Sequence, residues 1–182
     1  MLDVKNSSLK YFEDYKKKHN AKRYQEDCDD FELREHLRND LMKKQNSQCA
    51  YCERKIEKYN SHIEHIEPRD KAHKLECEYS NLVLSCNNLD SCGEYKDSTE
   101  WNKNFIHPVL NNPTKYFDYS FNGEILASNE NANETIKFLN LNNRKLTSLR
   151  KNLALQLINM KDIDNIELYF CEFENFVKFM LK

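Results

Sequence analysis

The chain has 182 residues, of which 39% are hydrophobic and 32% charged, and its formal net charge is −2. This balance indicates a water-soluble globular protein with one domain, or a small core with helical extensions, and it argues against a membrane protein. It also excludes the strong basic excess of proteins that hold nucleic acid unaided, so the basic residues must gather on one face or a partner must supply much of the grip.

The first ten residues lack the apolar centre of a secretory signal, and no stretch approaches the roughly 20 apolar residues of a membrane span. We therefore expect a cytoplasmic protein that makes no membrane contact. In that reducing compartment, paired cysteines favour a metal site over disulfides.

Two helices are predicted in an N-terminal extension, residues 1–45. The first spans residues 7–18, and the second runs from about Phe31 to Lys44 with Asp29 or Asp30 as its cap. A group of lysines and arginines accompanies the end of the first helix. We interpret this group as a solvated surface, with a phosphate or partner contact as the alternative.

The next segment, residues 46–104, predicts a small core in the order strand, strand, helix. Residues 62–66 alternate as a strand does, and residues 81–86 form a short apolar run typical of a buried strand. Residues 69–78 are polar and suit a loop or a short helix. A helix is expected to begin near Cys92 and to continue toward Trp101.

The remaining segment, residues 105–182, predicts a hairpin followed by helices. Asn122-Gly123 lies between apolar runs and favours a type I′ turn, in which both turn residues have positive φ. The helices are expected over residues 134–140 (capped by Asn131 or Asn133), 144–160 and 163–181. Their apolar stripes indicate a helical core, with a docking surface for another protein as the alternative.

Four of the seven cysteines form two pairs in the central segment, Cys49 with Cys52 and Cys86 with Cys92. Four thiolates in a tetrahedral arrangement favour Zn²⁺, and such a closed site is structural. The five-residue insert in the second pair exceeds the usual spacing, so Cys86 and Cys92 could instead be separate buried thiols. Cys77 lies in polar sequence and is not expected to have a partner, whereas Cys28 and Cys171 are expected to pack as small hydrophobic residues.

Glu64 and His65 are adjacent between the two cysteine pairs. Hydrolysis of a phosphodiester needs a base for water and a cation at the phosphate; a histidine suits the first role, and a carboxylate can hold Mg²⁺ or Mn²⁺. Neighbours on a strand point to opposite faces, so the pair can serve one site only if the backbone bends or if Glu64 orients its surroundings. His62 points to the same side as Glu64 and is either a supporting group or an ordinary surface histidine.

The order Cys-x₂-Cys, Glu-His, Asn-Leu-Val-Leu-Ser-Cys and Cys with Lys four positions later resembles the HNH, or ββα-metal, endonucleases. Phe105-Ile-His-Pro, Asn122-Gly-Glu-Ile and the segment from Thr135 to Asn142 further resemble one branch, the PtuB nuclease subunit of retron-associated and Septu anti-phage systems. The resemblance covers roughly residues 45 to 152. It implies an α+β fold, with a small zinc-bound ββα-metal core flanked by N-terminal helices and a C-terminal hairpin plus helices.

The same resemblance implies roles for single residues. His65 is the general base, Glu64 is a metal ligand or an orienting group, and Asn81 braces the loop that carries the base. The third motif position, where His or Asn is usual, falls on Gly93-Glu94-Tyr95, and we assign it to Glu94 because a carboxylate can ligate Mg²⁺. Lys96 matches the lysine at the end of the motif and is expected to contact a phosphate.

The resemblance also implies a partner, an ABC/SMC-like ATPase of the PtuA type, with this chain as the nuclease effector of an anti-phage complex. We expect the contact at the aromatic-rich ends, residues 1–45 and 145–182. Two alternatives stay open: a zinc-stabilised adaptor that binds without cutting, which Glu94 at the third position favours, and a nuclease that cuts RNA such as tRNA rather than DNA.

Overall fold

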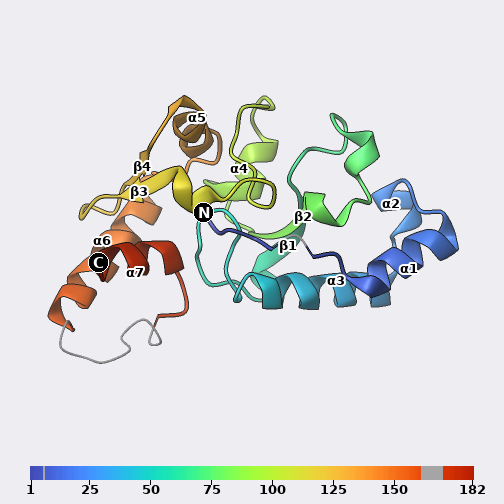
Figure 1. The fold of residues 1–182 in the computed structure, drawn as a ribbon, viewed down its shortest axis with the longest axis horizontal. Helices are drawn as coiled ribbons and strands as arrows, with labels where there is room; N and C mark the ends of the chain where they lie inside the picture. The colour runs from blue at the N-terminus through green and yellow to red at the C-terminus, as the bar shows by residue number, and fades with distance from the viewer. Residues whose placement is uncertain (6, 161–169) are drawn as a thin grey trace.

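The computed structural model describes residues 1–5, 7–160 and 170–182, and the fold is α+β (Figure 1). The molecule is elongated: α1, α2 and α3 lie at one end, a ββα core lies in the middle, and α6 and α7 lie at the other end (Figure 1). The helices are α1 (Lys10–His19), α2 (Tyr24–Asp27), α3 (Phe31–Lys44), α4 (Cys92–Asp97), α5 (Glu130–Phe138), α6 (Arg144–Asn159) and α7 (Glu174–Met180). The strands are β1 (Ser61–His65), β2 (Leu82–Cys86), β3 (Phe117–Tyr119) and β4 (Ile125–Ala127).

The ββα core consists of β1, β2 and α4. The two strands pair antiparallel, so that Ser61 lies opposite Cys86 and His65 opposite Leu82. Helix α4 packs against β2, and α3 also contacts that strand. The strand–strand–helix order predicted from the sequence is confirmed, and the first strand lies one residue earlier than expected.

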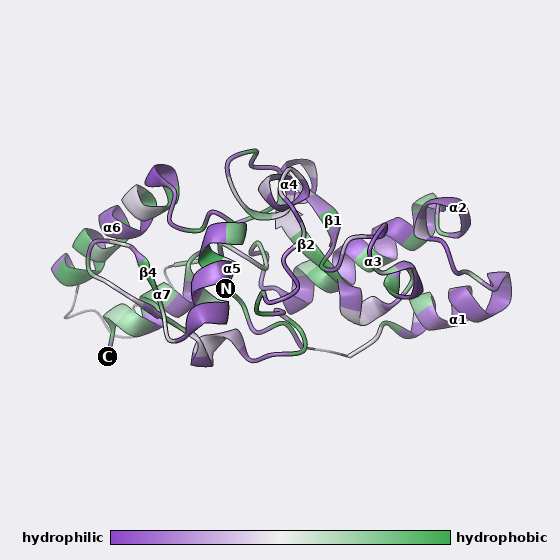
Figure 2. Cartoon of the chain, turned by 90° about the horizontal axis from the view of Figure 1, so that it is seen from above, coloured by the Kyte–Doolittle hydropathy of each residue, from purple (hydrophilic) through white to green (hydrophobic). Residues whose placement is uncertain are grey.

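Helix α3 has the predicted bounds because its cap and its apolar spacing are local signals. The Asp30 carboxylate accepts a hydrogen bond from Leu33 N at 2.7 Å, which identifies Asp30 rather than Asp29 as the cap. Leu33, Leu37 and Leu41 repeat along one face and are fully buried. At the far end of the molecule α1 is mostly hydrophilic (Figure 2), and Phe12 is its buried residue.

The short helix α2 lies between the two helices predicted for the N-terminal extension. The Asp27 carboxylate accepts hydrogen bonds from the backbone N–H groups of Lys22 and Arg23, at 2.7 and 2.8 Å. These bonds satisfy donors at the start of α2 and stabilise a single helical turn, which is too short to give a periodic apolar pattern.

The hairpin between β3 and β4 is confirmed, but the predicted type I′ turn is wrong. Gly123 has a φ of +82°, whereas Asn122 is not among the residues with positive φ. Ser120 N donates to Glu124 O and Gly123 N donates to Ser120 O, both at 2.9 Å, so the loop contains three residues and ends in a left-handed glycine. A Cβ atom on Gly123 would lie 2.3 Å from the carbonyl oxygen of Thr147 on α6, so close packing also requires the glycine.

Helix α5 begins four residues before the predicted start. Its cap is Asn129, whose side chain accepts from Ala132 N at 2.9 Å, and not Asn131 or Asn133. Several asparagines in this stretch could each cap a helix, and the sequence pattern does not choose between them. Helix α6 is capped by Asn143 and ends one residue before the predicted end.

The predicted helix over residues 163–181 is confirmed for Glu174–Met180, but it is wrong for residues 170–173, because α7 begins only at Glu174. Residues 163–169 lie outside the described residues. Phe173 has a φ of 57°, and its backbone N–H donates to Glu53 O at 2.7 Å, so tertiary contact fixes the start of α7. Within the described residues, no helix combines the length and apolar character needed to cross a membrane.

Candidate metal centre and active site

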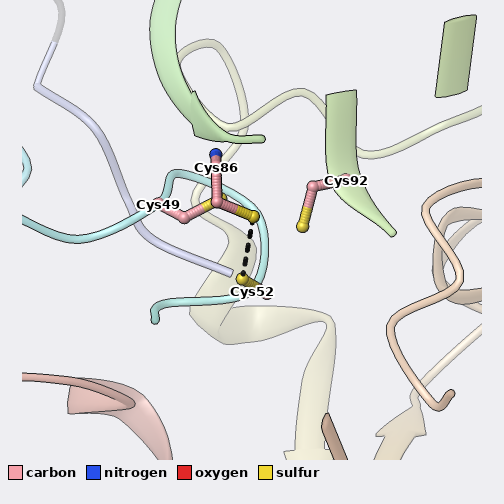
Figure 3. Close-up of side chains that lie close together, drawn as sticks. All are labelled: Cys49, Cys52, Cys86 and Cys92. Atoms are coloured by element: carbon pink, nitrogen blue, oxygen red, sulfur yellow. Dashed lines mark hydrogen bonds between the residues drawn. The ribbon is translucent and has the colours of Figure 1, made fainter. Parts of the chain in front are cut away.

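The four cysteines predicted to bind zinc lie together at the junction of the ββα core (Figure 3). Cys49 and Cys52 come from the turn before β1, Cys86 ends β2, and Cys92 begins α4. Their sulfur atoms all lie within 4.8 Å of one another, and the Sγ atoms of Cys52 and Cys86 are 3.9 Å apart. Tetrahedral zinc with Zn–S bonds near 2.3 Å separates its sulfurs by about 3.8 Å, so the set fits a structural Zn²⁺ site.

The surroundings of Cys49 favour a thiolate. Cys86 N approaches the Sγ of Cys49 at 3.4 Å, and backbone N–H groups at this distance stabilise a coordinating sulfur. Without an ion, the four sulfurs share their protons unequally: burial alone would raise the pKa of Cys49, but the neighbouring sulfurs hold it well below its ordinary value, whereas the pKa values of Cys52 and Cys92 lie well above theirs. Cys92 adopts a φ of 65° with its N–H bound to Leu139 O, a backbone shape that accommodates the long insert before it.

The other three cysteines differ from their predicted surroundings in two cases. Cys77 is buried, and its Sγ lies 3.7 Å from that of Cys28, so it does have a neighbour. Cys28 is buried as predicted. Cys171 is exposed and does not pack as a small hydrophobic residue.

A polar cleft opens between β1, the loop after it and α4. Residues 62–65 of β1 form one wall. The cleft is also lined by Arg23, Gln25, Pro68, Arg69, Asp70, Lys71, His73, Glu76, Lys96, Asp97, Thr99, Glu100 and Trp101. It therefore contains the predicted residues Glu64, His65 and Lys96 in one place.

His65 is held with one ring nitrogen bound and the other available. Its Nε2 lies 2.9 Å from the carbonyl oxygen of Glu76, which accepts a hydrogen bond, so Nε2 carries the proton and Nδ1 is the basic nitrogen. Tyr24 contacts the ring edge-on at 4.7 Å between centroids. Burial lowers the pKa of His65 below its ordinary value, which keeps the ring neutral near pH 7 and able to accept a proton.

Asn81 lies behind the cleft and ties together the loop after His65. Its Nδ2 donates to Glu67 O at 3.1 Å and to Leu75 O at 3.2 Å, and its Oδ1 accepts from Glu67 N at 2.8 Å. The side chain is buried and does not reach the cleft. This is the bracing geometry expected for Asn81.

Glu64 and Lys96 form a buried ion pair. Lys96 Nζ lies 3.0 Å from Glu64 Oε1, 2.9 Å from Asp97 Oδ1 and 3.2 Å from His65 O. Burial alone would lower the pKa of Lys96, but the two carboxylates outweigh it and raise the pKa. An ammonium has three donors, and all three are engaged here, so the geometry favours an internal role in which Lys96 holds Glu64. The expected contact of Lys96 with a phosphate stays a prediction.

His62, which the sequence left between a supporting and a surface role, lies beside Glu64 in the cleft. Its Nε2 lies 3.2 Å from Glu64 Oε2, and its Nδ1 lies 2.8 Å from Asn87 Oδ1. Burial would lower the pKa of His62, but Glu64, Asn87 and Glu94 together raise it to about 9. Strand alternation was the signal that placed His62 beside Glu64.

Glu94 is not brought next to Glu64. Its Oε1 lies 3.7 Å from His62 Nδ1, on the opposite side of the imidazole from Glu64, and its side chain is 42% exposed. Among the described residues, the four cysteines are the group of three or more side chains that converge as metal ligands. A metal at Glu64 would thus have fewer protein ligands and would keep water, as Mg²⁺ commonly does.

This arrangement, a strand-borne histidine and carboxylate over a four-cysteine cluster, agrees with a comparison to known families. Residues 49–88 match the HNH endonuclease family. The matched segment contains β1, β2, His65, Asn81 and three of the four cysteines. The match supports a nuclease of the HNH type, a class that depends on metal and acts on nucleic acid. A search of curated proteins gives no match, and the PtuB branch stays a prediction.

Proposed function

We propose that the protein is a metal-dependent endonuclease that hydrolyses phosphodiester bonds, with DNA as the preferred substrate. The observation that carries the proposal is the free Nδ1 of His65 in a polar cleft that also contains Glu64. The family match over residues 49–88 supports the same reaction class.

In this mechanism His65 Nδ1 takes a proton from the attacking water, while the carbonyl of Glu76 fixes the ring through Nε2. Asn81 holds the loop that contains that carbonyl. Glu64 would hold a divalent cation, Mg²⁺ or Mn²⁺, with Lys96 keeping the carboxylate in place. When bound, the cation supplies positive charge at the scissile phosphate and its leaving oxygen.

Basic side chains at the rim of the cleft can contact the nucleic-acid backbone. Arg23, Arg69 and Lys71 line the cleft, but Arg23 also pairs with Glu76 at 3.1 Å and Lys71 with Asp70 at 3.0 Å. These few cations, in a chain with a net charge of −2, give a weak grip on phosphate that carries no sequence information.

The decisive experiment compares purified wild-type protein with His65→Ala on plasmid DNA and on tRNA, with added Mg²⁺ or Mn²⁺ and with EDTA. We expect wild-type cleavage that requires the ion, and a loss of about 10²-fold or more in His65→Ala with the zinc content unchanged. His36→Ala is the control, because His36 is an exposed histidine on α3 outside the cleft. Cleavage of tRNA alone would reassign the substrate, whereas binding without any cleavage would support the adaptor alternative.

We further propose that the chain acts as the nuclease subunit of an anti-phage complex with a PtuA-like ABC/SMC-type ATPase. The sequence resemblance and the weak basic character support this proposal. Exposed apolar side chains at both ends of the molecule, Phe31 on α3 and Leu155 and Ile158 on α6, also suit a protein contact. Co-purification with the ATPase, and its loss after Phe31→Ser or Leu155→Ser, is the test. A monomer that is fully active alone would contradict the proposal.

A further inference from the structure

We propose that the divalent cation of this cleft is held by His62 and Glu64, two residues apart on β1, and that Gly93 is required to leave room for it. This inference rests on the proposed nuclease function and identifies the ligands of its metal. It replaces Glu94, the ligand expected from the sequence, with a histidine on the strand.

The first argument is convergence. Residues 62 and 64 point to the same face of β1, and the structure places His62 Nε2 3.2 Å from Glu64 Oε2. Two ligand atoms bound to one first-row cation at about 2.1 Å each lie close to 3 Å apart, so both atoms can reach one ion without moving far. His62 is accessible from the cleft, with a side-chain exposure of 29%.

The second argument is that the remaining atoms of both side chains are already oriented. Glu64 Oε1 faces Lys96 Nζ at 3.0 Å and Tyr51 OH at 3.4 Å, which leaves Oε2 for the ion. His62 Nδ1 lies 2.8 Å from Asn87 Oδ1, the kind of acceptor that holds the Nδ1 proton of a metal-binding histidine. An ion bound at Nε2 would displace the proton that lies between Nε2 and Glu64 Oε2 in its absence. A simple ion pair between His62 and Glu64 at the surface would not need Lys96 beside the carboxylate or Asn87 beside the imidazole.

The third argument is the glycine opposite the pair. A Cβ atom on Gly93 would lie 2.9 Å from Glu64 Oε2 and 3.0 Å from His62 Nε2, the same two atoms that converge. Position 93 therefore faces the proposed ion directly, and a side chain there would compete with His62 for the space. Gly93 has no positive φ that would otherwise require glycine, so the open space itself explains the residue.

Glu94 fits the role less well. Its carboxylate approaches the Nδ1 edge of the His62 ring at 3.7 Å, so the imidazole separates it from Glu64. Its exposure also leaves it free to rotate into solvent. An ion bound between His62 Nε2 and Glu64 Oε2 lies on the other edge of that ring.

The test is a titration of zinc-loaded protein with Mn²⁺. The electron paramagnetic resonance signal of unbound Mn²⁺ measures how much of the ion is bound. We expect one Mn²⁺ per wild-type chain, and an affinity about tenfold or more weaker in His62→Ala and in Glu64→Gln, since losing a ligand costs at least as much as losing an outer partner. Asn87→Ala and Gly93→Ala should weaken binding as well. Glu94→Gln and the exposed control His36→Ala should leave it unchanged.

A pair of substitutions makes the test independent of simple misfolding. Gly93→His alone should crowd the site and weaken Mn²⁺ binding. In His62→Ala/Gly93→His the new imidazole enters the volume vacated by residue 62, so the double variant should bind Mn²⁺ more tightly than either single variant. Zinc content and circular dichroism verify that each variant is folded.

The outcomes separate this inference from the nuclease proposal. Wild-type affinity in folded His62→Ala, or loss of Mn²⁺ in Glu94→Gln alone, overturns the ligand assignment while cleavage can persist. Failure of the wild-type chain to bind Mn²⁺ also overturns it. Mn²⁺ binding that depends on His62, in a chain that cuts neither DNA nor RNA, supports the inference and contradicts the proposed function.

Discussion

A single buried lysine, Lys96, holds the carboxylate at the centre of the cleft. Replacing it with methionine keeps the length of the side chain but leaves the buried Glu64 without its cation. We expect Lys96→Met to lower the free energy of unfolding by about 3–5 kcal/mol, the range for breaking a buried ion pair from one side. Urea unfolding of the zinc-loaded protein measures the effect.

The matched control is Lys71→Met, because Lys71 lines the same cleft but is exposed, and its change in stability should stay within about 0.5 kcal/mol. The two roles considered for Lys96 give opposite results. A phosphate-binding lysine would leave stability unchanged and reduce the salt dependence of DNA binding by about one phosphate contact. That pattern in Lys96→Met would contradict the internal role.

At the scale of single elements, the sequence predicts what is decided locally. Cap chemistry and leucine spacing gave the bounds of α3, and strand alternation placed His62 beside Glu64. Features that depend on packing between distant elements were not predicted. The Asn-Gly pair predicted the positive φ of Gly123 but not its close approach to Thr147 on α6, and the start of α7 is fixed by the bond from Phe173 to Glu53.

The candidate site divides in the same way. The cysteine spacing predicted the four-cysteine cluster, since two pairs of thiolate ligands are in themselves a signal for a zinc site. The burial of Lys96 and the space at Gly93 depend on where α4 docks against the strands, and no local pattern reports that. Arg150 is a further case: it looks like a surface residue of an amphipathic helix, yet it is 1% exposed and donates to Leu141 O at 2.8 Å.

The irregular segment between α4 and β3 is organised by a buried histidine, His107, and this predicts a pH dependence of stability. Its Nδ1 accepts from Val109 N and Leu110 N, each at 3.1 Å, and burial lowers its pKa to about 4. The unfolded chain, with a pKa near 6.5, therefore binds more protons than the folded chain between these values. The stability from neutral His107 is full above about pH 6.5 and falls as the pH drops toward 4, by up to about 3 kcal/mol.

His107→Asn provides the comparison, since its side-chain oxygen accepts the same bonds and does not titrate. We expect the difference in unfolding free energy between pH 7 and pH 5 to be smaller in His107→Asn than in the wild type. Equal differences in both proteins would show that His107 does not carry the effect.

For the whole molecule, the four-cysteine cluster (Figure 3) belongs to the ββα core, which lies in the middle of the elongated molecule (Figure 1). Leu2 N donates to Ala50 O within the Cys49–Cys52 turn, and Cys92 N donates to Leu139 O beyond α5. Glu53, next to Cys52, is buried and accepts from Asn175 N at 2.8 Å and from Tyr119 OH at 3.2 Å. The Cys49–Cys52 turn and Glu53 thus connect the N-terminal segment, the hairpin and α7.

Removing zinc should therefore unfold more than the core. Metal binding contributes on the order of 10 kcal/mol in small zinc modules, which equals the whole stability of many domains. We expect strong chelation, or Cys52→Ser, to abolish the cooperative thermal transition followed by circular dichroism and to expose α7 to proteolysis. Cys171→Ser, which changes an exposed cysteine outside the cluster, should retain one zinc per chain and the wild-type transition. Glu53 connects the turn to α7, so loss of the metal at the turn should also loosen α7. A zinc-free chain in which α7 stays protected from proteolysis would contradict this. It would show that the C-terminal helices are stable by themselves and that the cluster organises only the ββα core.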